Sequence, residues 1–273
     1  QLTAEILGLS DQDINKIQEL PYDVVAKAAN DARERLFEVT GIRHAWGPVH
    51  NEYIPVHPVG SEFAEQSKDI PLLIGSVLNE FTTIVRHEAV ELMMDNKKTW
   101  DEAKVVSKLK EKHGPKAEAV LHAFLKAYPG KIAADAYFAD ISFRRGVLET
   151  ARKKADQNGA PVFTYMFTYE SQVFDGVGMA WHCAEIPYVL GNAERIPSTG
   201  GGAEAKRLAE LASSAWINFA YHGNPNHDPI PTWPPFSSEQ GATMIMDSTW
   251  YVDYNHDQEL MELFTDDDDL QEF

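Results

Sequence analysis

The chain contains very little cysteine, with Cys183 the only one among its 273 residues. A single cysteine excludes a disulfide within the chain, a CxxC redox pair and a cysteine-based zinc site. The cysteine content therefore does not determine the cellular compartment. A chain without disulfides suits a reducing cytosol, and it also suits a periplasmic or secreted bacterial protein that does not use them.

Basic residues and long apolar runs are also scarce. The 24 lysines and arginines against 42 aspartates and glutamates give a formal net charge of −18. Without a basic cluster to displace counterions from phosphates, this composition argues against a nucleic acid partner. Apolar stretches such as PLLIGSVL are far shorter than the roughly 20 residues of a membrane span, and no N-terminal segment resembles a signal peptide. We therefore expect a soluble protein with no membrane span.

The ten histidines raise the question of a metal site. His87 and Glu91 would share one face of a helix, but the zinc-protease pattern needs a second histidine where Glu91 stands. The acidic tail 265–273 lacks the alternating ligands and central glycine of a calcium loop, and is typical of a solvated, disordered tail. We therefore expect neither a metal nor another cofactor.

The segments that are present alternate between strand and helix patterns. Segments 70–77 and 160–169 are short, apolar and rich in β-branched and aromatic residues, which is typical of buried strands in a mostly parallel sheet. The later segments ATMIMD and TWYVDY predict edge strands. Long apolar strands separated by helices favour an α/β fold over α+β.

Three helical features complete this pattern. Apolar residues recur at three- and four-residue steps between Leu208 and Phe219, which predicts a helix over 203–222 after a glycine-rich loop. Thr99 and Glu102 form a capping-box pattern at the start of another helix. Most of 81–157 has helical character, and we expect part of this insertion to form a lid or pocket wall.

Glu80 and His182 follow the two predicted central strands. Glu80 comes after 70–77 by a short loop, and His182 comes after 160–169 by a loop that contains glycines. Open α/β sheets place their chemistry at the carboxyl ends of their strands. A dry, unpaired carboxylate there is costly, so an imidazole is a natural partner for it. The alternative for His182 is a core histidine bonded to a backbone carbonyl.

A glutamate after one strand and a histidine after the next is the order in which α/β-hydrolases deliver the acid and base of a triad. The sequence also resembles the type-B carboxylesterases, the group that includes the para-nitrobenzyl esterases and the cholinesterases. The resemblance covers about 47–250 and rests on blocks in the family's order and spacing: GPVHNEYIPVHP, LLIGSVLNEFT, PVFTYMFTYES, WHCAEIPYVLGN, AWINFAYHGNPN and TWPPFSSEQGATMIMD.

The resemblance implies a role for three residues. His182 would be the general base, Glu80 its orienting acid, and Glu185 a carboxylate beneath the histidine. We interpret Cys183 as a small packed residue and not as a nucleophile. Four aromatic residues are candidates either for the walls of an acyl or alcohol pocket or for the core: Phe81, Phe138, Phe143 and Trp181.

The sequence departs from the family in one large respect, because it contains neither a G-x-S-x-G nucleophile motif nor the oxyanion-hole glycines. In the family both lie in the N-terminal half. We therefore expect the chain, from Gln1 to the acidic tail, to be the C-terminal part of a single α/β-hydrolase domain, completed by an N-terminal piece that carries the serine.

The expected function is hydrolysis of a small-molecule ester by the assembled enzyme, with no activity in this chain alone. The alternative is a non-catalytic adhesion or binding module, since cholinesterase-like proteins also use this fold in that way. Glu80 and His182 are the residue types that catalysis needs, which favours the enzyme.

Overall fold

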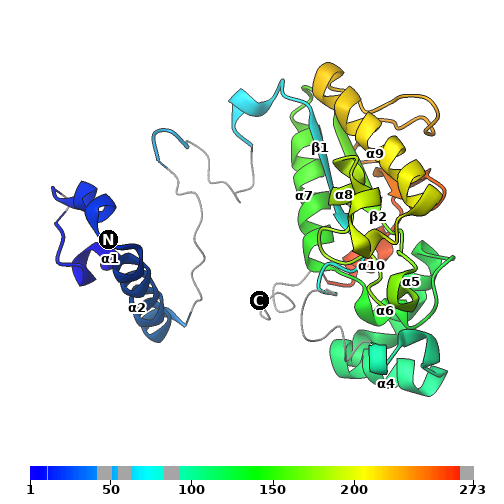
Figure 1. Cartoon of the computed structure of the whole chain (residues 1–273), viewed down its shortest axis with the longest axis horizontal. Coiled ribbons are helices and arrows are strands. Elements are labelled where there is room, and N and C mark those ends of the chain that lie inside the picture. Colours follow the sequence, from blue (N-terminus) through cyan, green and yellow to red (C-terminus); the bar gives the residue numbers. More distant parts are fainter. Residues whose placement is uncertain (11, 42–50, 55–62, 83–92, 265–273) are drawn as a thin grey trace. The chain divides into compact units, whose positions relative to one another are not determined.

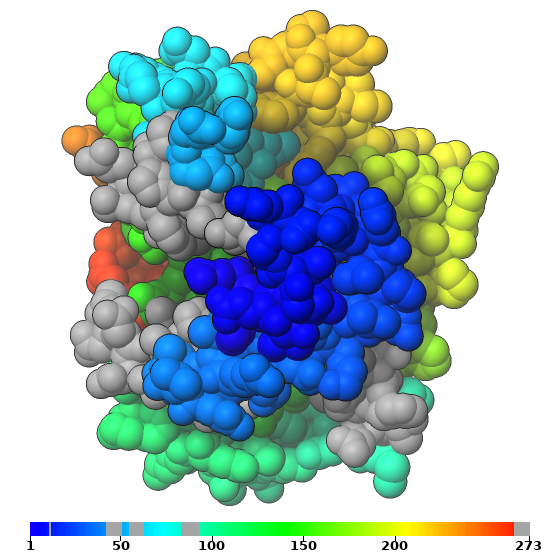
Figure 2. All heavy atoms as spheres, turned by 90° about the vertical axis from the view of Figure 1, so that its left-hand side faces the viewer, coloured from blue at the N-terminus to red at the C-terminus, as the bar shows by residue number. Residues whose placement is uncertain are grey.

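The computed structural model describes residues 1–10, 12–41, 51–54, 63–82 and 93–264 (Figure 1). Its contacts divide the chain into two compact units, Gln1–Val59 and Gly60–Phe273. In the first unit, α1 (Leu2–Ile6) packs against α2 (Tyr22–Thr40), and both are drawn in blue in Figure 2. Helix α2 ends at Gly41, which adopts the left-handed φ of 69° that closes many helices. That both units belong to one hydrolase domain stays a prediction.

The second unit contains a four-stranded sheet with the spatial order β1-β2-β3-β4. Strand β2 pairs in parallel with both β1 and β3, and β4 pairs antiparallel with β3. The predicted mostly parallel sheet of an α/β fold is confirmed. The expectation that both late strands lie at an edge is wrong for β3, which is buried throughout because β2 and β4 flank it. The bounds are β1 (Leu72–Val77), β2 (Val162–Phe167), β3 (Ala242–Met246) and β4 (Tyr251–Tyr254).

Helices cover both faces of this sheet (Figure 1). Side chains alternate between the faces of a strand, so Thr164 and Tyr165 of β2 point in opposite directions. Thr164 shares its face with Thr243, which accepts a hydrogen bond from Arg144 of α7 (Ser142–Asp156). On the other face the ring of Tyr165 packs 5.2 Å from that of Trp216 in α9 (Gly202–His222). Helix α9 confirms the helix predicted over 203–222.

The predicted helical insertion contains several short helices. Residues 83–92, which include His87 and Glu91, lie outside the described residues, as does the tail 265–273. Helix α4 begins after Asp101, whose carboxylate accepts from the Lys104 N–H at 2.8 Å. The capping box on Thr99 is therefore wrong, because Asp101 stands directly before the helix and serves as its N-cap. The remaining bounds are α4 (Glu102–His113), α5 (Ala117–Ala127), α6 (Asp135–Phe138), α8 (Ile186–Val189) and α10 (Gln258–Glu262).

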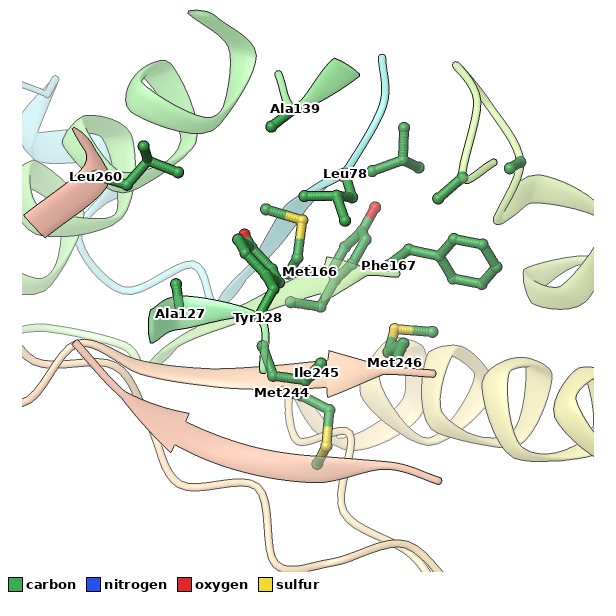
Figure 3. Packing of buried hydrophobic residues seen from close by; sticks show 14 of the residues in the cluster. Leu78, Ala127, Tyr128, Ala139, Met166, Phe167, Met244, Ile245, Met246 and Leu260 are labelled. Atoms are coloured by element: carbon green, nitrogen blue, oxygen red, sulfur yellow. The ribbon is translucent and has the colours of Figure 1, made fainter. Parts of the chain in front are cut away.

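The core lies where the sheet meets these helices (Figure 3). Met166 and Ile245 of the two central strands are almost fully buried, and Leu78, directly after β1, is buried with them. Burial of such side chains contributes about 1.5–3 kcal/mol each. None of the helices in the described residues is both long and apolar enough to cross a membrane.

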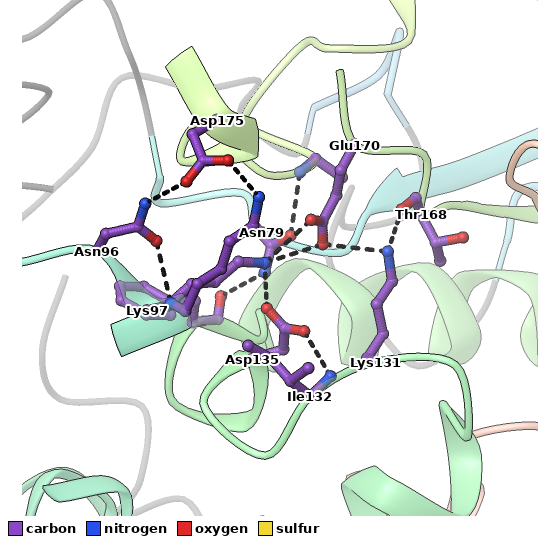
Figure 4. A network of polar contacts seen from close by, with 12 residues as sticks. Asn79, Asn96, Lys97, Lys131, Ile132, Asp135, Thr168, Glu170 and Asp175 are labelled. Carbon is purple, nitrogen blue, oxygen red and sulfur yellow. Dashed lines mark hydrogen bonds and ion pairs between the residues drawn. The ribbon is translucent and has the colours of Figure 1, made fainter. Parts of the chain in front are cut away.

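A buried ionic network joins the helical insertion to the carboxyl end of β2 (Figure 4). Lys97 contacts Asp135, at the start of α6, and lies 3.0 Å from Glu170, which follows β2. Lys131 lies 3.1 Å from Glu170 and donates to the Thr168 carbonyl at 2.7 Å. Buried charges persist only when they are paired, so these contacts fix residues 97–138 at this edge of the sheet.

Candidate active site

Glu80 and His182 are brought together beyond the carboxyl ends of β1 and β2. The Glu80 Oε2 atom lies 2.5 Å from His182 Nδ1, and Oε1 accepts from the Val77 N–H at 3.1 Å. The Glu80 side chain is 9% exposed, whereas that of His182 is 56% exposed. The buried carboxylate therefore fixes one ring nitrogen of an imidazole whose remaining surface is open. A carboxylate at Nδ1 fixes the tautomer that leaves Nε2 able to accept a proton.

The loops that carry these two side chains run in parallel and are hydrogen-bonded to each other. Asn79 and Trp181 form an isolated parallel bridge, outside the named strands. The Asn79 N–H donates to the Ala180 carbonyl at 3.0 Å, and further along the loops the His182 N–H donates to the Thr82 carbonyl at 3.3 Å. The acid and the base thus occupy adjacent loops at one edge of the sheet.

Glu185 is a second carboxylate in the same environment. Burial raises the pKa of the Glu185 carboxyl, and the negative charge of Glu80 raises it further. His182 and a hydrogen bond with the Tyr165 hydroxyl lower this pKa. Its Oε2 atom is buried and lacks a hydrogen-bond partner among the described residues. The charges of Glu80 and His182 thus both act on Glu185, while its role stays a prediction.

Cys183 is exposed, so the expectation of a small packed residue is wrong. It occupies a tight turn directly after His182, where its φ is 68°. Partial burial raises the pKa of the thiol, and the negative charges of Glu185 and Glu80 raise it further. These surroundings disfavour the thiolate that a cysteine nucleophile requires.

The four aromatic candidates separate into two pairs. The Phe143 ring lies 6.1 Å from the His182 ring and 5.6 Å from that of Phe81, and both phenylalanines are about half exposed. In contrast, Phe138 packs on Trp100 at 5.3 Å, and Trp181 packs against the core. Of the four candidates, Phe143 therefore lies beside the imidazole, and Phe81 packs on Phe143.

Asp140 is a buried residue at this site that the sequence analysis did not select. Its N–H donates to the Leu78 carbonyl at 2.8 Å, and its carboxylate accepts from the N–H groups of Phe143 and Arg144 at the start of α7. Burial raises its pKa to about 6, against the opposing effect of these amides, and the charge of Glu80 adds to the shift. An aspartate just before a helical pattern is a known N-terminal signal and could have identified it.

Sequence comparison gives a family match and a set of curated relatives. The model of the carboxylesterase family matches residues 2–262. The para-nitrobenzyl esterase of Bacillus subtilis is 26% identical over 262 residues, which is 93% of this chain and 50% of that protein. The phenmedipham hydrolase of Pseudarthrobacter oxydans is 28% identical over 212 residues, which is 74% of this chain and 40% of that protein.

Solved structures agree with these matches. An esterase from anaerobic Clostridium hathewayi, described as able to hydrolyse aliphatic aromatic polyesters, superimposes with a TM-score of 0.81 at 29% identity. The match covers 97% of this chain and 51% of that one. A para-nitrobenzyl esterase structure gives a TM-score of 0.60 at 23% identity and supports the α/β-hydrolase fold alone. The chain spans about half the length of these relatives.

Proposed function

Because the chain belongs to the carboxylesterase family, we propose that it supplies the acid and the base of a serine carboxylic-ester hydrolase. The observation that carries the proposal is the 2.5 Å contact between Glu80 Oε2 and His182 Nδ1. An acid held on a backbone amide, and a mostly exposed imidazole held on that acid, have the geometry of the acid and base of a catalytic triad.

In this mechanism His182 moves one proton in each half-reaction. Nε2 takes the proton of a serine hydroxyl as the serine oxygen attacks the ester carbonyl carbon. As the tetrahedral intermediate collapses, the bond to the leaving alkoxide breaks and Nε2 gives that oxygen its proton. Water then attacks the acyl-enzyme in the same way, which releases the acid and restores the serine. Glu80 stabilises the imidazolium at each stage.

We place the serine on the N-terminal half of the same hydrolase, because no G-x-S-x-G motif occurs among these 273 residues. The position of β1 supports this. It ends the sheet in the described part of the chain, although its residues Leu72, Leu73 and Ile74 are apolar and only half-buried. Parallel strands are normally covered on both sides, and an open apolar edge invites pairing. The N-terminal half would pair with that edge.

The proposed substrate is a small carboxylic ester with an aromatic group. Phe143 beside His182, with Phe81 packed on it, offers aromatic surface near the proposed base. The names of the relatives, para-nitrobenzyl esterase and a hydrolase of aliphatic aromatic polyesters, are consistent with such a substrate. No cofactor takes part in this chemistry.

A fluorophosphonate probe, which reacts with activated serines, tests the proposal. We expect the hydrolase that contains this chain to be labelled on a serine outside these 273 residues, and His182→Ala to remove the labelling. The proposal would be contradicted by a hydrolase that turns over a p-nitrophenyl ester but carries the label on Cys183, or carries no labelled serine. A protein that neither turns over esters nor accepts the probe would fit the adhesion module instead.

A further inference from the structure

Asn79 uses both its backbone and its side chain to join the loops of the proposed acid and base. Its N–H donates to the Ala180 carbonyl at 3.0 Å, and its side-chain oxygen accepts from the Ala180 N–H at 3.1 Å. The asparagine thus pairs with both the backbone N–H and the backbone carbonyl of Ala180, two residues before His182. Its own carbonyl accepts from the Thr82 N–H at 2.9 Å and closes the turn that holds Glu80.

The side-chain amide of Asn79 reaches a third segment. Its Nδ2 donates to the carbonyl of Phe138 at 3.1 Å, at the end of α6. The residue is 1% exposed. A buried amide whose donor and acceptor are both used is costly to replace, because each lost contact leaves another buried polar group unpaired.

The orientation of His182 depends strongly on its backbone. Its side chain is 56% exposed, is held by Glu80, and lies 6.1 Å from the ring of Phe143. Within this chain, side-chain packing therefore constrains the imidazole weakly. The position of residues 180–182 determines where the ring meets Glu80, and Asn79 holds Ala180 in that position.

We propose that Asn79 is a positioning residue for the acid-base pair, an inference that rests on the proposed function of Glu80 and His182. It fixes the spacing of the two loops and ties both to the end of α6. It does not contact the reacting atoms. Loss of the side chain would let the 180–182 segment shift, and a misplacement of about 1 Å can cost roughly 100-fold in rate.

The experiment compares Asn79→Ala with Asn226→Ala in the assembled hydrolase. Asn226 is a matched control, because its Nδ2 donates to the Trp233 carbonyl at 2.8 Å and its oxygen accepts from the Trp233 N–H at 2.6 Å. We expect Asn79→Ala to lower kcat by about 100-fold with little change in KM. Asn226→Ala should reduce stability and leave the kcat of the folded protein unchanged.

A second measurement follows the Glu80 to His182 contact directly. In protein labelled with ¹⁵N-histidine, the Nδ1 proton of His182 is identified as the signal that His182→Ala removes. We expect Asn79→Ala to shift or broaden it and Asn226→Ala to preserve it. If the alanine variant does not fold, Asn79→Asp replaces it. Aspartate keeps the acceptor for Ala180 but not the donor to Phe138, and we expect it also to shift or broaden the Nδ1 signal.

Two outcomes separate this inference from the proposed function. An unchanged kcat and an unchanged Nδ1 signal in the Asn79 variant, with His182→Ala inactive, would overturn the positioning role and leave the proposed function intact. Full activity of His182→Ala would overturn the proposed function, and the Nδ1 signal alone would then decide whether Asn79 holds the loops.

Discussion

Gly75 and Tyr165 stand opposite each other on β1 and β2, and the tyrosine ring occupies the space that a side chain on Gly75 would need. A Cβ atom at Gly75 would lie 2.4 Å from the Tyr165 ring. Because the glycine leaves that space open, the ring can lie across β1 and its hydroxyl can interact with Glu185. Gly75 on β1, the strand that precedes Glu80, thus makes room for the tyrosine that interacts with Glu185.

Gly75→Ala should therefore displace Tyr165. We expect a loss of about 1–3 kcal/mol in the free energy of unfolding, which is typical of an overpacked core, and a lower kcat through Glu185. Urea unfolding and ester turnover measure the two effects. Gly146→Ala is the control, since Gly146 is exposed in α7 with open space around it. That change should be neutral or stabilising by up to about 1 kcal/mol. Equal effects of the two substitutions would refute the close contact.

Asp140 predicts a pH-dependent stability. Its pKa is about 6 in the folded protein and 3.8 as the ordinary value, so the folded state holds the proton more tightly. Protonated Asp140 therefore stabilises the folded state below pH 4. This contribution to the free energy of unfolding, about 3 kcal/mol, is lost as the pH rises toward 6. Relative to the wild type, Asp140→Asn should become more stable between pH 4 and pH 7.

Denaturant unfolding across that pH range measures the difference. Asp101→Asn, at the exposed N-cap of α4, controls for the loss of a capping hydrogen bond as such. A constant difference between the wild type and Asp140→Asn at all pH values would show that Asp140 does not titrate in this window.

Cys183 should be dispensable and slow to react. Because the pKa of its thiol is raised, little thiolate is present at neutral pH, and alkylation by iodoacetamide should be slow although the residue is exposed. Glu185→Gln removes a nearby negative charge and should accelerate alkylation. Cys183→Ser should keep ester turnover within about twofold, because the thiol makes no covalent bond in the mechanism. Loss of turnover in that variant would indicate thiol chemistry.

Phe143 should influence which esters are preferred. Phe143→Ala removes aromatic surface beside His182. An aromatic pair contributes about 0.5–1.5 kcal/mol beyond burial, so kcat/KM for a phenyl ester should fall about two- to tenfold relative to that for an aliphatic ester of equal size. Tyr254→Ala, on the opposite edge strand β4, should leave this ratio unchanged. A ratio unaffected by Phe143→Ala would remove the phenylalanine from the pocket.

The sequence predicts those features that depend on local pattern and on the geometry of parallel sheets. Apolar periodicity predicts β1, β2 and helix α9. The rule that parallel strands end at one edge of a sheet predicts the proximity of Glu80 to His182. The N-cap of α4 lies two residues after the predicted Thr99, because Asp101 stands directly before the helix and its carboxylate accepts from the Lys104 N–H.

The remaining features depend on contacts between distant segments, which no local pattern encodes. Lys97, Asp135 and Glu170 form one buried network, although 73 residues separate the first from the last. The contact of Asn79 with Ala180 spans 101 residues. An asparagine or a lysine is ordinarily a surface residue, so only the folded chain reveals these as buried groups with specific partners.

The most direct test of the central claim is ester turnover by His182→Ala and Glu80→Gln in the hydrolase that contains this chain. We predict that His182→Ala lowers kcat for a p-nitrophenyl ester by on the order of 10⁴ or more, with a smaller loss for Glu80→Gln, because the members of a triad act together. Retention of near wild-type kcat by folded His182→Ala would contradict the assignment of His182 as the base.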